Sequence, residues 1–152
     1  MKISENISYI EATCSNVGSR LNLKNSPSEK DIDAMYKVAT EVFEPLREWV
    51  GGPVKVNSFF RGVDLNKSIG GSSDSQHCRG QAIDIDDTFG GKTNAEMFYY
   101  IVNNLKFDQI IWEFGDDNNP DWVHVSYVSE KENRGRAMRS IKVNGRMQYI
   151  LI

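Results

Sequence analysis

The stretch that decides how this chain folds reads Ser75-Gln76-His77-Cys78-Arg79-Gly80-Gln81-Ala82-Ile83-Asp84. Residues 72–80 are polar and contain glycine, which predicts a loop. Residues 81–86 alternate as in a β-strand, with Asp84 and Asp86 on one face and two isoleucines on the other. A carboxylate on an otherwise apolar strand is costly to bury unless a cation or a hydrogen-bond donor meets it. The stretch therefore predicts a polar loop that leads into a strand with a polar group to satisfy.

The N-terminal part of the chain before this stretch is predicted to be helical. Residues 7–23 carry apolar positions at helical intervals, which indicates one or two short helices. The run Ser26-Pro27-Ser28-Glu29 predicts a helix start, with Ser26 as the cap and a glutamate three residues later. This helix should run to about residue 50, bend or break near Pro45, and end at Gly51-Gly52.

The rest of the chain is predicted to be mostly strands. Residues 53–60, 107–114 and 122–128 read as strands, and Asn144-Gly145 between two β-prone runs signals a closing hairpin. Two helices interrupt them, at residues 64–69 and from a capping box at 93–96 to about residue 105. Helices followed by strands predict an α+β fold, with N-terminal helices packed on a mainly antiparallel sheet. The length of 152 residues favours one domain over 1–152.

Composition excludes several classes of protein. The net charge is −3 and the charges are mixed, so the basic footprint of a nucleic-acid-binding protein is absent. The four basic residues of 131–139 are accompanied by Glu130 and Glu132, and the stretch is expected to form a solvated surface turn. Two cysteines cannot build a disulfide framework. No run approaches the ~18 apolar residues of a membrane span, and no signal-peptide core is visible. We therefore expect a protein made in the cytoplasm.

The two histidines of the chain are candidate metal ligands. His77 stands seven residues before Asp84, and His124 lies in the second of the predicted C-terminal strands. Zinc in hydrolases usually takes three protein ligands and leaves one position for water, and two imidazoles with one carboxylate meet that requirement. Asp86 is an alternative to Asp84 because both face the same side, but the seven-residue spacing from His77 favours Asp84. Cys78 is assigned to packing, since adjacent side chains in an extended segment diverge.

Several separated motifs resemble the M15 family of zinc D-Ala-D-Ala peptidases. Residues 75–84 resemble its first metal motif, and Asp121-x-x-His124 resembles its second, in which an acidic residue precedes the last histidine by three positions. Arg61 stands where the family has an active-site arginine. The flanking sequence also resembles that of compact members of the family found in phages. The similar segments are Pro45-Leu46-Arg47, Gly51-Gly52-Pro53, Asn66-Lys67 with Gly70-Gly71, and Ile111-Trp112-Glu113-Phe114-Gly115. The resemblance covers roughly residues 25–128. Trp122 stands where many relatives have a further histidine.

The resemblance implies a hedgehog/DD-peptidase-like fold and a role for each site residue. His77, Asp84 and His124 would bind one Zn²⁺ per chain, and Asp121 would be the general base. Arg61 would stabilise the developing oxyanion or bind a substrate carboxylate, and Ser75 would hydrogen-bond the substrate backbone. Glu113 is the alternative base, because it is the only charge in residues 110–115. A partner to a metal-bound histidine is an equally good interpretation of Glu113.

The implied function is hydrolysis of peptidoglycan stem peptides at bonds next to D-amino acids, as in a D-Ala-D-Ala carboxypeptidase. An L-Ala-D-Glu endopeptidase of the endolysin type would use the same metal site. A non-catalytic, zinc-containing binding module of the same fold is the third alternative, since fold alone does not fix function. The expected partners are stem peptides, with no nucleic acid and no membrane span, and the expected state is a monomer. The expected place of action is the cell wall, reached through a phage lysis system or a virion.

Overall fold

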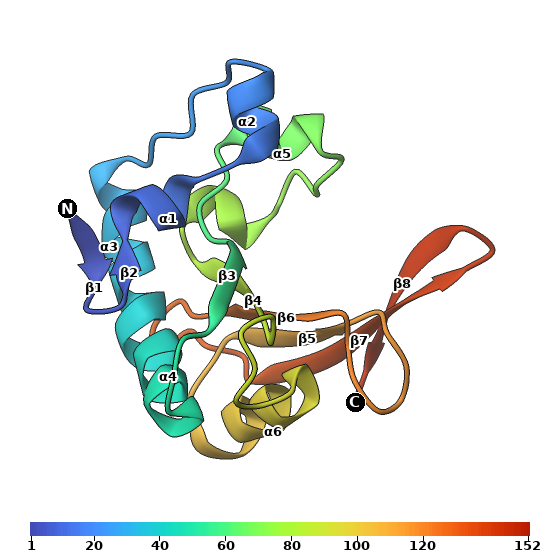
Figure 1. Cartoon of the computed structure of the whole chain (residues 1–152). Coiled ribbons are helices and arrows are strands. Elements are labelled where there is room, and N and C mark those ends of the chain that lie inside the picture. Colours follow the sequence, from blue (N-terminus) through green and yellow to red (C-terminus); the bar gives the residue numbers. More distant parts are fainter.

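The computed structural model describes residues 1–152 and has helices layered against a six-stranded sheet. Figure 1 shows the arrangement of these helices and strands. The helices are α1 (Tyr9–Thr13), α2 (Asn16–Arg20), α3 (Glu29–Val38), the π-helix η1 (Ala39–Phe43), α4 (Glu44–Val50), α5 (Val63–Ser68), the 3₁₀-helix η2 (Gln76–Arg79) and α6 (Asn94–Asn104). The strands are β1 (Lys2–Ser4), β2 (Ile7–Ser8), β3 (Lys55–Ser58), β4 (Ala82–Asp86), β5 (Gln109–Glu113), β6 (Trp122–Ser126), β7 (Arg136–Val143) and β8 (Arg146–Leu151).

The predicted α+β class and mainly antiparallel sheet are confirmed. The large sheet has the order β3-β4-β6-β5-β7-β8, and β1 pairs with β2 in a small separate sheet. Every neighbouring pair of the large sheet is antiparallel except β5 and β7, which run parallel. The sheet is therefore mixed, and the short N-terminal strands β1 and β2 were not predicted. None of the helices is long and apolar enough to cross a membrane.

The long N-terminal helix forms as predicted, but its cap was placed wrongly. Ser28, not Ser26, is the N-cap of α3, and it forms a capping box with Asp31. The shorter side chain of Asp31 closes the box two residues further along, which leaves Ser26 outside the helix. The π-helix η1 ends just before Pro45, where proline has no N–H and its ring crowds the preceding turn. Gly51 ends α4 in the left-handed conformation at φ 79°.

The hydrophobic core lies between the helices and one face of the sheet. The buried cluster contains Met35, Val38, Phe43 and Leu46 of the long helix, Phe98 and Ile101 of α6, and the inward residues Ile83, Ile85, Ile110, Trp112, Val123 and Val125 of the central strands. Because side chains alternate along a strand, the intervening residues of β4, β5 and β6 point to the opposite face. The helical layer therefore leaves that second face free for a site.

The C-terminal end forms a hairpin that projects from the body of the molecule (Figure 1). Asn144 and Gly145 join β7 to β8, both with positive φ, which confirms the predicted turn. The prediction of a solvated turn over residues 131–139 was wrong in its second half, because β7 begins at Arg136 and pairs with the central strand β5. This parallel pairing joins segments that no local pattern connects.

Candidate metal centre and cavity

Strand register brings the second histidine to the carboxylate. Asp84 of β4 lies directly opposite His124 of β6, and His124 in turn lies opposite Ile111 of β5. Directly paired residues point to the same face, so all three side chains stand on the face that the helices leave free. The Nδ1 of His124 lies 2.9 Å from Asp84 Oδ1.

His77 reaches the same carboxylate from η2, where the sequence predicted an irregular loop. Ser75 caps this 3₁₀-helix by accepting a hydrogen bond from the His77 backbone N–H, and Gly80 ends it at φ 69°. The His77 ring is held by Phe59, whose carbonyl oxygen lies 2.7 Å from Nδ1. Nδ1 must carry the proton to donate to a carbonyl, which leaves Nε2 as the free lone pair. That Nε2 lies 3.2 Å from Asp84 Oδ1.

The three groups have the chemistry and spacing of a zinc site. Their ligand atoms, one from each of His77, Asp84 and His124, lie within 4.8 Å of one another. Ligand atoms around a tetrahedral zinc stand roughly 3.4 Å apart, given Zn–N and Zn–O bonds of about 2.0–2.1 Å. Burial opposes the charge on Asp84, but the two histidines outweigh it and hold the pKa of this carboxyl well below its usual range. The residues present therefore fit a divalent metal ion.

The two alternative ligands do not join this cluster. Asp86 accepts a hydrogen bond from the side chain of Asn94, the first residue of α6, and another from the backbone N–H of Asp87. Cys78 is partly buried beside His77 but is not among the grouped ligand atoms. The spacing argument that favoured Asp84 over Asp86 agrees with this arrangement.

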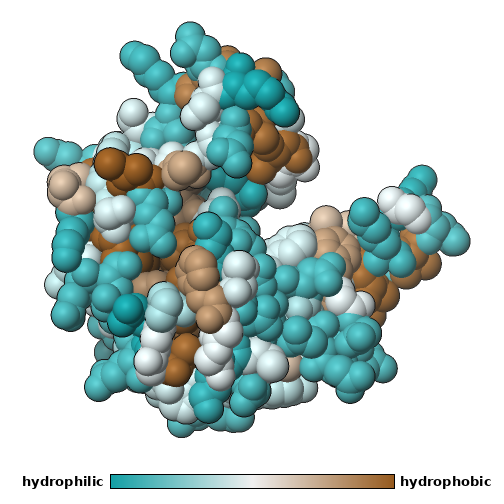
Figure 2. Space-filling model, viewed as in Figure 1, coloured by the Kyte–Doolittle hydropathy of each residue, from teal (hydrophilic) through white to brown (hydrophobic).

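A cavity of about 1050 Å³ opens over the three ligands. One side is formed by residues 69–79, and the other by strand residues of β5, β7 and β8. Figure 2 shows the surface hollowed between the region of α2 and α5 and the projecting hairpin. The cavity also receives four arginines, namely Arg61, Arg79, Arg134 and Arg136. The site thus combines a buried ligand cluster with room for an extended ligand.

Glu113 stands beside the cluster on the same face of the sheet. It pairs with Trp122 of β6 on one side and with Ser140 of β7 on the other. The residue is only 7% exposed, and the Ser140 hydroxyl donates a hydrogen bond of 2.6 Å to its Oε2. Burial raises the pKa of the Glu113 carboxyl, although the Ser140 hydroxyl and the nearby His124 partly oppose this. A carboxyl group with a raised pKa beside a metal cluster is typical of a catalytic acid or base.

Asp121 is not brought to the cavity. It precedes β6 by one residue, and strand alternation puts Trp122 and His124, rather than Asp121, on the cavity face. Its side chain is exposed and does not line the cavity. Its backbone N–H donates to the Glu113 carbonyl, and its own carbonyl accepts from Asn94. Asp121 therefore lies just before β6, where the alternation of the strand turns its side chain away from the face that carries His124.

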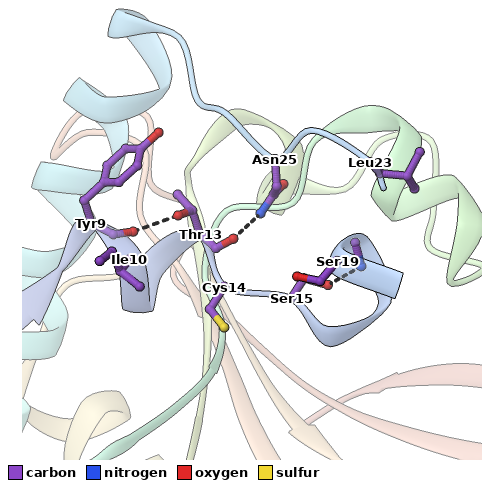
Figure 3. Close-up of a pocket in the computed structure, with 9 residues that line it drawn as sticks. Tyr9, Ile10, Thr13, Cys14, Ser15, Ser19, Leu23 and Asn25 are labelled. Atoms are coloured by element: carbon purple, nitrogen blue, oxygen red, sulfur yellow. Dashed lines mark hydrogen bonds between the residues drawn. The ribbon is translucent and has the colours of Figure 1, made fainter. Parts of the chain in front are cut away.

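Arg61 lines the cavity and is fixed through its backbone. Its N–H donates to the carbonyl of His77, and its buried Nε has no hydrogen-bond partner within the chain. Asn25 secures the flanking residues, since its side chain donates to the Phe60 carbonyl and accepts from the Gly62 N–H. Figure 3 shows Asn25 also bonded to the Thr13 carbonyl, in a second, smaller hollow near α1 and α2. The N-terminal segment thus holds in place the loop that carries Arg61.

Ser75 lies on the rim of the cavity, with its hydroxyl accepting from the His77 backbone. The sequence analysis did not predict several other residues that line the cavity. Met138 comes from β7, Met147 and Tyr149 come from β8, and Ile111 of β5 contributes apolar surface beside His124. The Asn-Gly turn predicted the hairpin but not which strand lies beside it. The hairpin reaches the site only because β7 pairs with β5.

These features define a class, a hydrolase-type metal centre with a buried carboxyl group next to it. Comparison with known families agrees, because residues 9–126 match Peptidase M15. The chain belongs to the Peptidase M15 family, whose members are zinc-dependent metallopeptidases. A comparison with curated proteins found no match. The family assignment and the zinc-ligand geometry thus agree on a metallopeptidase.

Proposed function

We propose that this chain is a zinc peptidase that cuts peptidoglycan stem peptides at bonds next to D-amino acids, as a D-Ala-D-Ala carboxypeptidase does. The observation that carries the proposal is the grouping of His77, Asp84 and His124 within 4.8 Å under an open cavity. A zinc ion held there would supply an activated water and polarise the scissile carbonyl. Membership of Peptidase M15 supports the same reaction class.

We assign the general base to Glu113 rather than to Asp121. The Ser140 bond occupies Oε2 of Glu113, so Oε1 is free to take a proton from the attacking water and later deliver it to the leaving amine. The raised pKa brings this carboxyl closer to neutral pH, where a base that must also act as an acid is most efficient. The exposed Asp121 has neither the position nor the surroundings for this role.

Arg61 is proposed to bind negative charge on the substrate side. Arg61 lines the cavity, so its guanidinium could donate to a substrate carboxylate or to a developing oxyanion that enters it. A planar guanidinium suits both, because it donates two parallel hydrogen bonds. Ser75 is proposed to contact the substrate backbone from the rim. Its present bond to His77 uses one lone pair and leaves its hydroxyl proton available.

The buried Glu113 favours an enzyme over a binding module. A module that only holds a ligand needs no carboxyl group with a raised pKa against its metal ligands. Endopeptidase cleavage of L-Ala-D-Glu is the second candidate, because a cavity of about 1050 Å³ has room for residues on both sides of the cleaved bond. Action at the cell wall, reached through a phage lysis system or a virion, is part of the proposal. So is a monomeric state.

The test is product analysis. The zinc-loaded protein is incubated with purified muropeptides that carry pentapeptide stems, and the products are identified by mass spectrometry. Loss of one terminal alanine is expected for the carboxypeptidase, whereas release of the stem peptide beyond its first residue indicates the endopeptidase. The metal-free protein is the control and should leave the substrate intact. Zinc-loaded protein that leaves every stem intact would refute the proposed function.

A further inference from the structure

The C-terminal hairpin β7–β8 lies outside the residues matched by the family, 9–126, yet it forms one wall of the cavity. Met138 of β7 and Met147 and Tyr149 of β8 all line it. Figure 2 shows hydrophobic residues along the part of the hairpin that borders the hollow. Because the family match ends at residue 126, it gives no role to this wall of the cavity.

Strand register puts Tyr149 in line with Glu113. Glu113 of β5 pairs with Ser140 of β7, and Ser140 pairs with Tyr149 of β8, so the three side chains lie on one face of adjacent strands. Directly paired side chains have Cβ atoms about 4.5–5.5 Å apart. Ser140 is fully buried and its hydroxyl is given to Glu113, whereas Tyr149 is 52% exposed at the cavity. Tyr149 is thus the most exposed side chain of the row.

Tyr149 brings a hydroxyl donor to a largely apolar part of the wall, where the other nearby donors are the Trp122 indole, which packs against Phe114, and the Lys142 ammonium, which lies over the Phe114 ring. Its neighbours there, Phe114, Met138 and Met147, offer only apolar surface from their side chains. Burial raises the pKa of the Tyr149 phenol, and the negative charges of Glu113 and Asp84 raise it further. The phenol therefore keeps its proton across the neutral range. It also lies within electrostatic reach of both carboxylates.

We infer that Tyr149 is a substrate-binding residue, whose phenol O–H donates a hydrogen bond to an oxygen of the bound peptide on the Glu113 side of the ligand cluster. The methionines of the hairpin would form the apolar surface beneath the same residue of the peptide. The inference rests on the proposed function, because it requires a peptide in the cavity. It makes the hairpin a determinant of which peptides bind.

The test removes only the hydroxyl. Tyr149→Phe is made in the Glu113→Gln background, which should bind without turnover, and the affinity for a D-Ala-D-Ala-terminated stem pentapeptide is measured by calorimetry. Loss of one neutral hydrogen bond should raise Kd roughly 3–10-fold. In the otherwise unaltered protein the same substitution should lower kcat/KM, with zinc content and Tm unchanged.

The matched control is Tyr99→Phe. Tyr99 is 54% exposed, as Tyr149 is, but it lies on α6 and contacts Phe98 and Trp112 on the helix side of the sheet. This variant should bind the peptide as its parent does. If Tyr149→Phe changes neither Kd in the Glu113→Gln background nor kcat/KM in the otherwise unaltered protein, the inference alone is overturned. A parent that neither binds nor cleaves any stem peptide would overturn the proposed function and this inference together.

Discussion

Replacing Ser140 by alanine should shift the pH dependence of the enzyme without removing its base. The Ser140 hydroxyl donates to Glu113 Oε2 at 2.6 Å and favours the charged form of that carboxyl. Burial already raises the pKa of Glu113, so the loss of this donor should raise it further. A hydrogen bond to a charged group contributes about 1.5–3 kcal/mol, and one pKa unit corresponds to about 1.4 kcal/mol. The expected rise is therefore about 1–2 units.

The assay is kcat/KM of the zinc-loaded protein on a stem peptide, measured across pH. A base must be deprotonated to act, so the acidic limb should move to higher pH by about 1–2 units in Ser140→Ala, while the rate above the limb stays near that of the parent. Ser126→Ala is the control. Ser126 lies on β6 and, like Ser140, is fully buried, but its hydroxyl is bonded to the backbone of Gln109 and not to Glu113. An acidic limb that stays in place, moves to lower pH, or moves equally in both variants would refute the assignment.

Three further predictions concern the metal, the arginine and the fold. The double variant His77→Ala with His124→Ala should lose zinc and activity together, and full zinc occupancy by metal analysis would contradict the site. Arg61→Ala should lower kcat roughly 10²–10³-fold with little change in Tm, and Arg61→Lys should recover only part; unchanged kinetics would remove Arg61 from the site. Gly80→Ala should destabilise by roughly 1–3 kcal/mol, because its φ is 69° and a Cβ would clash with the main chain of α3, whereas Gly52→Ala, in open space, should leave Tm nearly unchanged.

The metal ligands could be named from the sequence because local patterns, together with the resemblance to known metal motifs, mark them. Alternation along residues 81–86 put Asp84 on the polar face, and the His77 spacing and strand position of His124 supplied the other two groups. The capping box at Thr93 and the Asn144-Gly145 turn were also local, and both formed as expected. The capping box and the turn depend on residues within a few positions of one another, whereas His124 reaches Asp84, 40 residues away, through the pairing of β6 with β4.

The rest depends on pairing between distant segments. The resemblance to the second metal motif implied Asp121 as the base, but the start of β6 leaves it exposed and places Trp122 opposite Glu113 instead. The parallel pairing of β5 with β7 gives Glu113 its bond from Ser140 and brings the hairpin to the cavity. No periodicity in the sequence encodes which strands become neighbours, so these contacts could not be read from it.

The most direct test of the central claim compares two carboxyl groups in zinc-loaded protein. Turnover of a D-Ala-D-Ala-terminated stem peptide is measured for Glu113→Gln and Asp121→Asn, with zinc content determined on the same samples. Both substitutions keep the shape of the side chain and remove the ability to take a proton. The account predicts that Glu113→Gln retains zinc and loses roughly 10²–10⁴-fold in rate, while Asp121→Asn remains near the parent. Zinc-loaded Glu113→Gln with parental turnover, beside an inactive Asp121→Asn, would contradict it.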